Sequence, residues 1–227
     1  MNYLNTHYSE KVRPVTSYPR QLAGFLAERF GFTSGMRMLV FGCGRGELAQ
    51  QFRDRQIDVV AADVSPDAGK LLQVNDVVLL DAESKPIPFS DNEFDLVFSK
   101  SVLEHLPDPY VTSKELVRVL KPGGKLVTLT PDWEKNFKIF FDDITHVRPF
   151  SRNTLCQLYE LLNLEEIDVF RFRQLPSCWK YRSVDRLAAV IGLFVRPRTK
   201  VKFLRWSREL MIAGSGRKAI SSTKTTR

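Results

Sequence analysis

The sequence predicts an α/β fold: a doubly wound, mostly parallel seven-stranded sheet, helices on both faces, and a small basic helical insertion before the last strand. Short apolar runs alternate with segments of helical spacing through most of the chain. The runs are apolar at successive positions, as strands buried on both faces are. The alternation of strands and helices at this spacing predicts a doubly wound parallel sheet.

The expected strands are the apolar runs at residues 36–41, 57–62, 77–80, 94–98, 125–130, 166–172 and 209–213. The expected helices are residues 18–30, 46–55, 102–120, 151–162 and 184–194. Pro107 and Pro109 should interrupt the third helix, because proline removes a backbone donor. Ser151 is placed to cap the fourth. Lys121-Pro122-Gly123-Gly124 should separate a helix from the next strand.

The length of 227 residues suits one domain. We expect this domain at 1–220, with an N-terminal lid or helix at 1–30, a core at 36–172, the basic insertion at 175–207 and a disordered tail at 221–227. The lid would include His7, Tyr8 and Tyr18. Alternatively, this region is a helical strap that packs beside the core.

Composition excludes several classes of protein. Hydrophobic residues make up 43% and charged residues 26%, as in soluble globular proteins. No apolar run approaches the ~20 residues of a membrane span, and the first residues show no signal peptide, so a cytoplasmic location is expected. The three cysteines are scattered and lack metal-ligand spacing, so neither a disulfide framework nor a metal site is expected.

The positive charge is concentrated near the end of the chain. Residues 171–227 hold 15 Lys and Arg against 2 Asp and Glu, a balance of +13, which leaves −5 for the first 170 residues and +8 in total. Such a segment suits phosphate, nucleic acid or an anionic membrane surface, or is simply a solvated charged face.

Three strand ends carry residues suited to a nucleotide-type ligand. A glycine turn, Gly42 to Gly46, follows the first strand and lets a ligand approach the backbone closely. Asp63 ends the second strand, where a carboxylate can bind ribose hydroxyls. Asp81 and Ala82 end the third, where a carboxylate and an amide can read an adenine edge. Ligands of open α/β sheets bind at this edge.

Four stretches resemble a class I S-adenosylmethionine-dependent methyltransferase of the broad bacterial type: LVFGCGRGELAQQF, VVAADVSP, LLDAESKPIPFSDNEFDLVFSKSVLEHLPDP and ELVRVLKPGGKLVTLTPDW. The resemblance covers residues 18–164. It implies a Rossmann-like fold, S-adenosylmethionine as cofactor, and residues 36–172 as the cofactor-binding core. A dinucleotide dehydrogenase would need glycine at position 47, which is Glu47.

The resemblance also implies which residues bind the cofactor. Gly42 and Gly44 would flank its methionine part, Asp63 would hold the ribose, and Asp81 with Ala82 the adenine. Ser99 and Lys100 would lie beneath the sulfonium and the carboxylate. The full expected set is Gly42, Cys43, Gly44, Gly46, Asp63, Asp81, Ala82, Ser99 and Lys100.

The expected catalytic residues are His146, Asp143 and His105. His146 lies in a D-x-T-H-x-R-P-F-S stretch that resembles a subset of these enzymes acting on bacterial glycans and secondary metabolites. As a base it would take a proton from an acceptor hydroxyl, with Asp143 orienting it or holding a sugar hydroxyl. Alternatively, this loop only caps and packs the next helix, and His105 only lines the pocket.

The predicted function is methyl transfer to an oxygen of a glycan, a lipid-linked precursor or a small molecule. Trp, Phe and Arg mix in the basic insertion, which suits a phosphate- or lipid-bearing acceptor and peripheral contact with the inner membrane face. Two alternatives stay open. One is an RNA or nucleobase methyltransferase that uses the basic segment, and the other is a non-catalytic cofactor-binding subunit.

Overall fold

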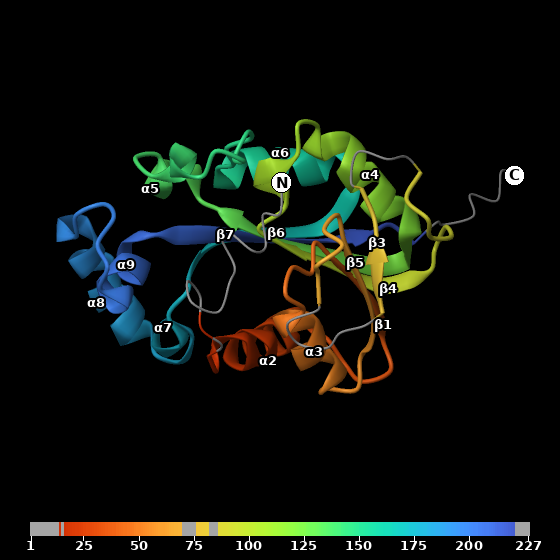
Figure 1. Cartoon of the computed structure of the whole chain (residues 1–227), viewed down its shortest axis with the longest axis horizontal. Coiled ribbons are helices and arrows are strands. Elements are labelled where there is room, and N and C mark those ends of the chain that lie inside the picture. The colour runs from red at the N-terminus through yellow and green to blue at the C-terminus, as the bar shows by residue number, and fades with distance from the viewer. Residues whose placement is uncertain (1–13, 15, 70–75, 82–85, 221–227) are drawn as a thin grey trace, which may run out of the picture.

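The computed structural model describes residue 14 and residues 16–69, 76–81 and 86–220, and it confirms the predicted fold. A seven-stranded sheet runs in the order β3-β2-β1-β4-β5-β7-β6, with helices on both faces (Figure 1). Only β7 runs antiparallel to its neighbours. The strands are β1 (Arg37–Phe41), β2 (Asp58–Asp63), β3 (Val77–Leu79), β4 (Phe94–Lys100), β5 (Leu120–Pro131), β6 (Leu164–Arg173) and β7 (Leu210–Lys218).

Two apolar layers enclose the sheet. On one face lie α2 (Tyr18–Phe30) and α3 (Glu47–Arg53), and on the other α4 (Pro109–Val119) and α6 (Arg152–Leu161) (Figure 1). Successive side chains of β1 point to opposite layers: Met38 packs beneath α2 and α3, and Leu39 beneath α4 and α6. This burial on both faces explains why the strand is a continuous apolar run.

The predicted helix boundaries follow from local chemistry. The hydroxyl of Ser151 accepts the amide of Thr154 at 3.2 Å and caps α6 as expected. Prolines interrupt the helix predicted at 102–120, as expected. A 3-10 turn, η2 (Leu103–His105), ends before Pro107. The next helix, α4, starts at Pro109 after Asp108, whose carboxylate accepts the Val111 amide at 3.0 Å.

Two strands, β5 and β7, run through glycines at which the sequence predicted a strand boundary. The Lys-Pro-Gly-Gly segment lies inside β5, where a Cβ on Gly124 would come within 3.1 Å of the Asp95 carbonyl oxygen. Likewise β7 continues past Gly214. A Cβ on Gly214 would lie 2.9 Å from Leu155 of α6, and a Cβ on Gly216 would lie 2.9 Å from Leu164 of β6. These glycines allow close packing and do not end the strands.

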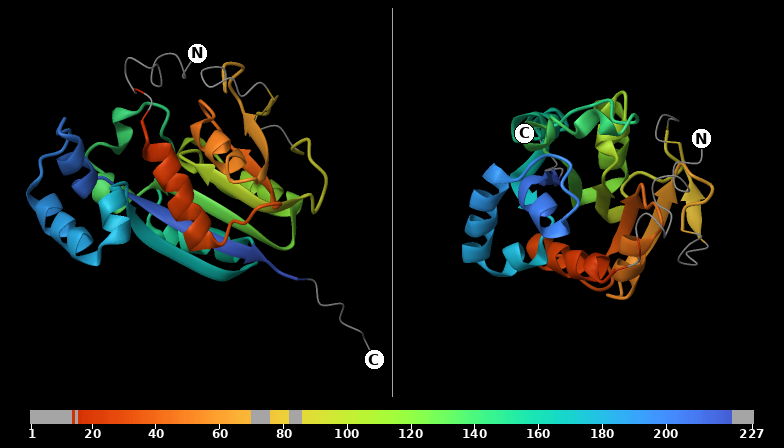
Figure 2. Two further views of the ribbon diagram at one scale, coloured as in Figure 1. Left: turned by 90° about the horizontal axis from the view of Figure 1, so that it is seen from below. Right: turned by 60° about the vertical axis from the view of Figure 1, so that its left-hand side comes forward.

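The predicted basic insertion is confirmed as three helices, α7 (Pro176–Lys180), α8 (Arg182–Phe194) and α9 (Lys202–Arg208). They group together at one end of the molecule, away from β3 (Figures 1 and 2). Tyr18 contacts this group through Trp206, with ring centroids 5.1 Å apart. None of the helices in the described ranges is both long and apolar enough to cross a bilayer. His7, Tyr8 and the tail at 221–227 lie outside the described residues.

Candidate active site

The register of the sheet aligns the ends of four neighbouring strands. Phe41 pairs with Ala62 of β2 on one side and with Ser99 of β4 on the other. Asp63 pairs with Leu79, the last residue of β3. The glycine turn and Asp81 therefore follow β1 and β3, and Asp63 and Lys100 end β2 and β4, at one edge of the sheet. The sequence predicted this arrangement.

The glycine turn is fastened to β2 by Asp63. Its two carboxylate oxygens accept the Gly44 amide at 2.8 Å and the Ser65 amide at 2.9 Å. Gly42, Gly44 and Gly46 all have positive φ angles, of 75°, 54° and 86°, which other residues adopt only at a cost. Apart from Gly44 and its two neighbours in the chain, no described residue has an atom within 4 Å of a Cβ built on Gly44. The turn thus presents open backbone toward that side.

The other expected binding residues vary in their surroundings. The Ser99 hydroxyl is buried and makes no hydrogen bond within the described part of the chain. Burial raises the pKa of Cys43 to about 12, so its thiol stays protonated. Lys100 ends β4 and Asp81 is exposed after β3. Ala82 lies outside the described residues.

The glycine turn also touches the segment that follows β4. A Cβ on Gly42 would lie 2.2 Å from the Cγ2 atom of Val102, which shows how closely Val102 approaches the turn. Val102 directly precedes η2, which carries Glu104 and His105. The turn is therefore in contact with the segment that holds these two polar side chains.

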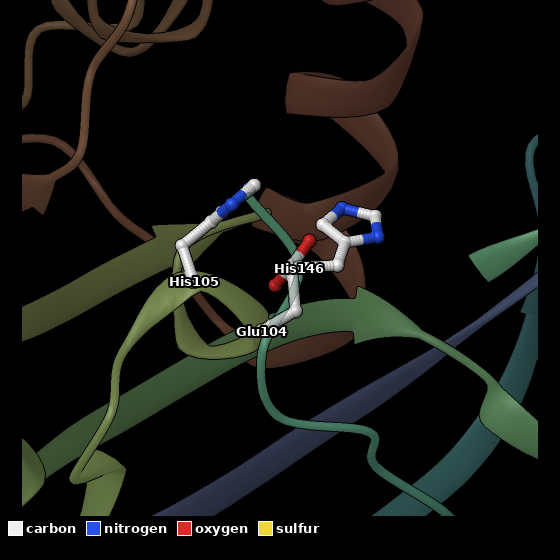
Figure 3. A group of neighbouring side chains, drawn as sticks. All are labelled: Glu104, His105 and His146. Carbon is white, nitrogen blue, oxygen red and sulfur yellow. The ribbon is translucent and has the colours of Figure 1, made fainter. Parts of the chain in front are cut away.

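Glu104, His105 and His146 converge beside this segment (Figure 3). One potential ligand atom of each lies within 4.8 Å of the others. The two imidazole rings are 4.8 Å apart between centroids. His146 arrives from the loop between β5 and α6, whose backbone is tied to η2: the Val147 and Arg148 amides both donate to the Glu104 carbonyl oxygen.

Backbone carbonyl oxygens orient both rings. The Nδ1 of His146 lies 2.7 Å from the carbonyl oxygen of Phe140, in a second 3-10 turn, η3 (Phe140–Asp142). The Nδ1 of His105 lies 3.2 Å from the carbonyl oxygen of Thr145. A carbonyl oxygen only accepts, so Nδ1 carries the hydrogen in both rings and Nε2 keeps a lone pair.

The carboxylate of Asp143 acts on His105 through Thr145. The Thr145 hydroxyl donates to Asp143 at 2.6 Å and lies 2.9 Å from the Nδ1 of His105, from which it accepts. Its amide also donates to Asp143, at 3.0 Å. This chain of hydrogen bonds links Asp143 to His105, whereas the sequence predicted that Asp143 orients His146 or holds a sugar hydroxyl.

Glu104 is 1% exposed, and the Thr130 hydroxyl donates to its Oε2 at 2.9 Å. Its Oε1 is buried and has no hydrogen-bond partner within the described ranges. Burial raises the pKa of Glu104 to about 7. Burial, followed by the nearby His146, lowers the pKa of His105. Two imidazoles and a carboxyl group of this kind can move a proton, and they could also hold a divalent cation.

Glu104 and Thr145 were not predicted from the sequence as site residues. Both stand beside residues that were, Glu104 before His105 and Thr145 before His146. Leu103 and Leu106, which flank Glu104 and His105, were a signal that this segment is buried. The hydrogen bond of Thr145 to His105 spans 40 residues of sequence and had no local signal.

Comparison with known proteins gives the family of the core. The pattern described as "Methyltransferase domain" matches residues 39–128. This chain contains a methyltransferase domain. The matched segment holds the glycine turn, Asp63, Asp81, Ser99 and His105, and stops before the loop of His146.

Two curated methyltransferases resemble this part of the chain. The demethylmenaquinone methyltransferase of Renibacterium salmoninarum is 32% identical over 110 residues, which cover 48% of this chain and 46% of that protein. The 27-O-demethylrifamycin SV methyltransferase of Amycolatopsis mediterranei is 33% identical over 122 residues, which cover 49% of this chain and 43% of that protein. The chain thus spans less than half the length of these relatives.

Solved structures extend the likeness of the fold beyond the matched segment. A SAM-dependent methyltransferase from Archaeoglobus fulgidus superposes with a TM-score of 0.64 at 20% identity, covering 92% of this chain and 97% of that one. Phosphoethanolamine N-methyltransferase 2 of Haemonchus contortus gives a TM-score of 0.67 at 17% identity, covering 96% of this chain and 59% of that one. Together with the family match, they confirm the predicted class I methyltransferase fold.

Proposed function

We propose that this methyltransferase transfers a methyl group from S-adenosylmethionine to a hydroxyl oxygen of a glycan, a lipid-linked precursor or a small-molecule acceptor. The contact between Gly42 and Val102 carries the proposal, because it holds the glycine turn against the segment of Glu104 and His105. A cofactor at the turn and an acceptor at the histidines would then be neighbours.

The residues at the strand ends fit this cofactor. The open side of Gly44 admits a close approach to the backbone, and Asp63 keeps lone pairs beyond the two that accept amides. The unpartnered hydroxyl of Ser99 supplies a buried polar contact at the end of β4. When bound, S-adenosylmethionine supplies an electrophilic methyl group on a sulfonium. The protein supplies position and electrostatics.

The histidine cluster would act on the acceptor. A hydroxyl oxygen that gains a methyl group must lose its proton, and the basic nitrogen of a neutral imidazole can take it. The lowered pKa of His105 keeps its ring neutral near pH 7. His146, held by the Phe140 carbonyl oxygen, faces the same cluster. We assign the base to this histidine pair.

Calorimetric titration with S-adenosylmethionine tests the division of roles. Asp63→Ala should weaken binding roughly 30-fold, because a hydrogen bond to a charged group is worth about 1.5–3 kcal/mol. His146→Ala should leave cofactor affinity unchanged and abolish methyl transfer in a mass-shift screen of acceptors. Asp58→Ala, at the opposite end of β2, is the matched control. Equal losses in the Asp63 and His146 variants would contradict the assignment.

A further inference from the structure

The outward side of α8 is an apolar stripe that no described part of the chain covers. Leu187, Val190, Leu193 and Phe194 are 58%, 55%, 75% and 83% exposed. Their spacing of three and four residues places them on one side of the helix. The opposite side is fixed inward, because Ala188 is fully buried and a Cβ on Gly192 would lie 2.5 Å from the Ser207 carbonyl oxygen of α9.

Basic side chains frame this stripe. Arg182 and Arg186 are exposed at the start of α8, and Arg196, Lys200 and Lys202 are exposed just after it. Two further apolar side chains, Val201 and Phe203, are exposed on either side of Lys202. Residues 175–207 hold eight Lys and Arg and one acidic residue, Asp185, which pairs with Arg173 at 2.6 Å. The surface therefore combines exposed apolar groups with uncompensated positive charge.

Charge and chemistry together indicate what covers the stripe. A second copy of this chain would bring two positive surfaces into contact. Single-stranded nucleic acid favours aromatic stacking platforms, whereas this stripe is mainly aliphatic. An anionic bilayer matches both features, because apolar side chains enter the interface while basic ones attract the lipid headgroups. With 13 residues, α8 is about 20 Å long and suits lying on a membrane.

The stripe is linked to the candidate active site. Arg198 lies in the basic connection between α8 and α9, and its guanidinium binds both carboxylate oxygens of Asp142 at 2.7 Å. Asp142 precedes Asp143 in the loop that carries His146. Docking of the stripe would thus bring this loop close to the membrane surface.

We propose that the stripe of Leu187, Val190, Leu193 and Phe194, with its basic frame, docks on an anionic membrane surface and brings a lipid-linked acceptor to the histidine cluster. The acceptor assignment rests on the proposed methyl transfer, while the docking surface does not. The lipid part of such an acceptor would stay in the bilayer, and its polar part would reach the site beside Asp142.

Vesicle flotation of the full chain tests the surface. The protein should float with vesicles rich in phosphatidylglycerol and not with pure phosphatidylcholine, and salt should weaken binding. Leu193→Asp with Phe194→Asp should reduce partitioning on the order of a hundredfold. Leu161→Asp, at a residue of α6 that is 63% exposed and lies outside the stripe, should not change partitioning. Absence of wild-type binding, or an equal loss in both variants, would overturn the proposal.

Three further measurements separate the remaining outcomes. The oligomeric state of the wild type and of the stripe variant is the first. If the wild-type protein does not float with vesicles, and is a dimer that the stripe substitutions dissociate, the stripe binds a second copy and the inference is wrong. Calorimetry with S-adenosylmethionine on the same samples reports the proposed function separately: a protein that floats but binds no cofactor overturns only that function. With labelled cofactor and membranes of the source organism, label should enter the lipid extract. Label confined to water-soluble products overturns the acceptor assignment.

Discussion

Replacing Gly42 by alanine should destabilise the protein in two separable ways. The φ angle of 75° costs an L-residue about 1–2 kcal/mol. The added Cβ would also lie 2.2 Å from Cγ2 of Val102, and relieving such overpacking costs about 1–3 kcal/mol. The expected loss in the free energy of unfolding is therefore about 2–5 kcal/mol for Gly42→Ala.

Gly44→Ala separates the two contributions. Its φ of 54° imposes the same kind of backbone cost, but no described atom lies within 4 Å of the new Cβ. Its stability should fall by only about 1–2 kcal/mol, although cofactor binding should weaken because the methyl group enters the open side of the turn. Adding Val102→Ala to Gly42→Ala should recover the contact part and leave the backbone part.

Urea unfolding of the four proteins, with calorimetric titration of S-adenosylmethionine, measures both effects. The reasoning is refuted if Gly42→Ala and Gly44→Ala lose equal stability. It is also refuted if removing the Val102 methyl groups brings no recovery in the Gly42→Ala background. Either result would mean that the close approach of Val102 to the turn does not exist in solution.

Three other predictions concern the histidine cluster. Burial raises the pKa of Glu104 to about 7 from an ordinary 4.5, so the folded protein retains a proton that the unfolded chain releases between these values. This contribution to stability is complete below pH 4.5 and is lost as pH rises through 7, by up to about 3 kcal/mol. Urea unfolding of wild type and Glu104→Gln at several pH values should show this fall in the stability difference between the two proteins. A difference that does not change with pH would contradict the prediction. Thr145→Val should slow methyl transfer about tenfold, because it releases His105 from Asp143, and should leave cofactor affinity unchanged. Thr145→Ser keeps the hydroxyl and should transfer methyl groups at a nearly normal rate. Equal rates in wild type and both variants would exclude a role for the hydrogen bonds through Thr145. Because the sequence predicts no metal site, dialysis against a chelator should leave methyl transfer intact. Activity that is lost on dialysis and restored by a divalent cation would instead identify Glu104, His105 and His146 as a metal centre.

The sequence by itself determined the class of fold and the row of strand ends. Runs such as residues 36–41 are apolar at every position because both faces of the sheet are covered, and this pattern is local. Glycines and aspartates directly after such runs fall at one edge because parallel strands end together. The caps and breaks at Ser151 and Pro109 also depend on neighbours within a few residues.

The tertiary structure alone decided how far β5 and β7 extend and how the catalytic candidates are arranged. Gly214 looked like a strand end, yet its place is set by Tyr159, which lies 55 residues away. Nothing near Glu104 in sequence indicates that its carboxyl group lies within 4.8 Å of His146, or that the Thr145 hydroxyl links Asp143 to His105. Such contacts join segments some 40 residues apart, and their geometry exists only once the sheet has brought those segments together.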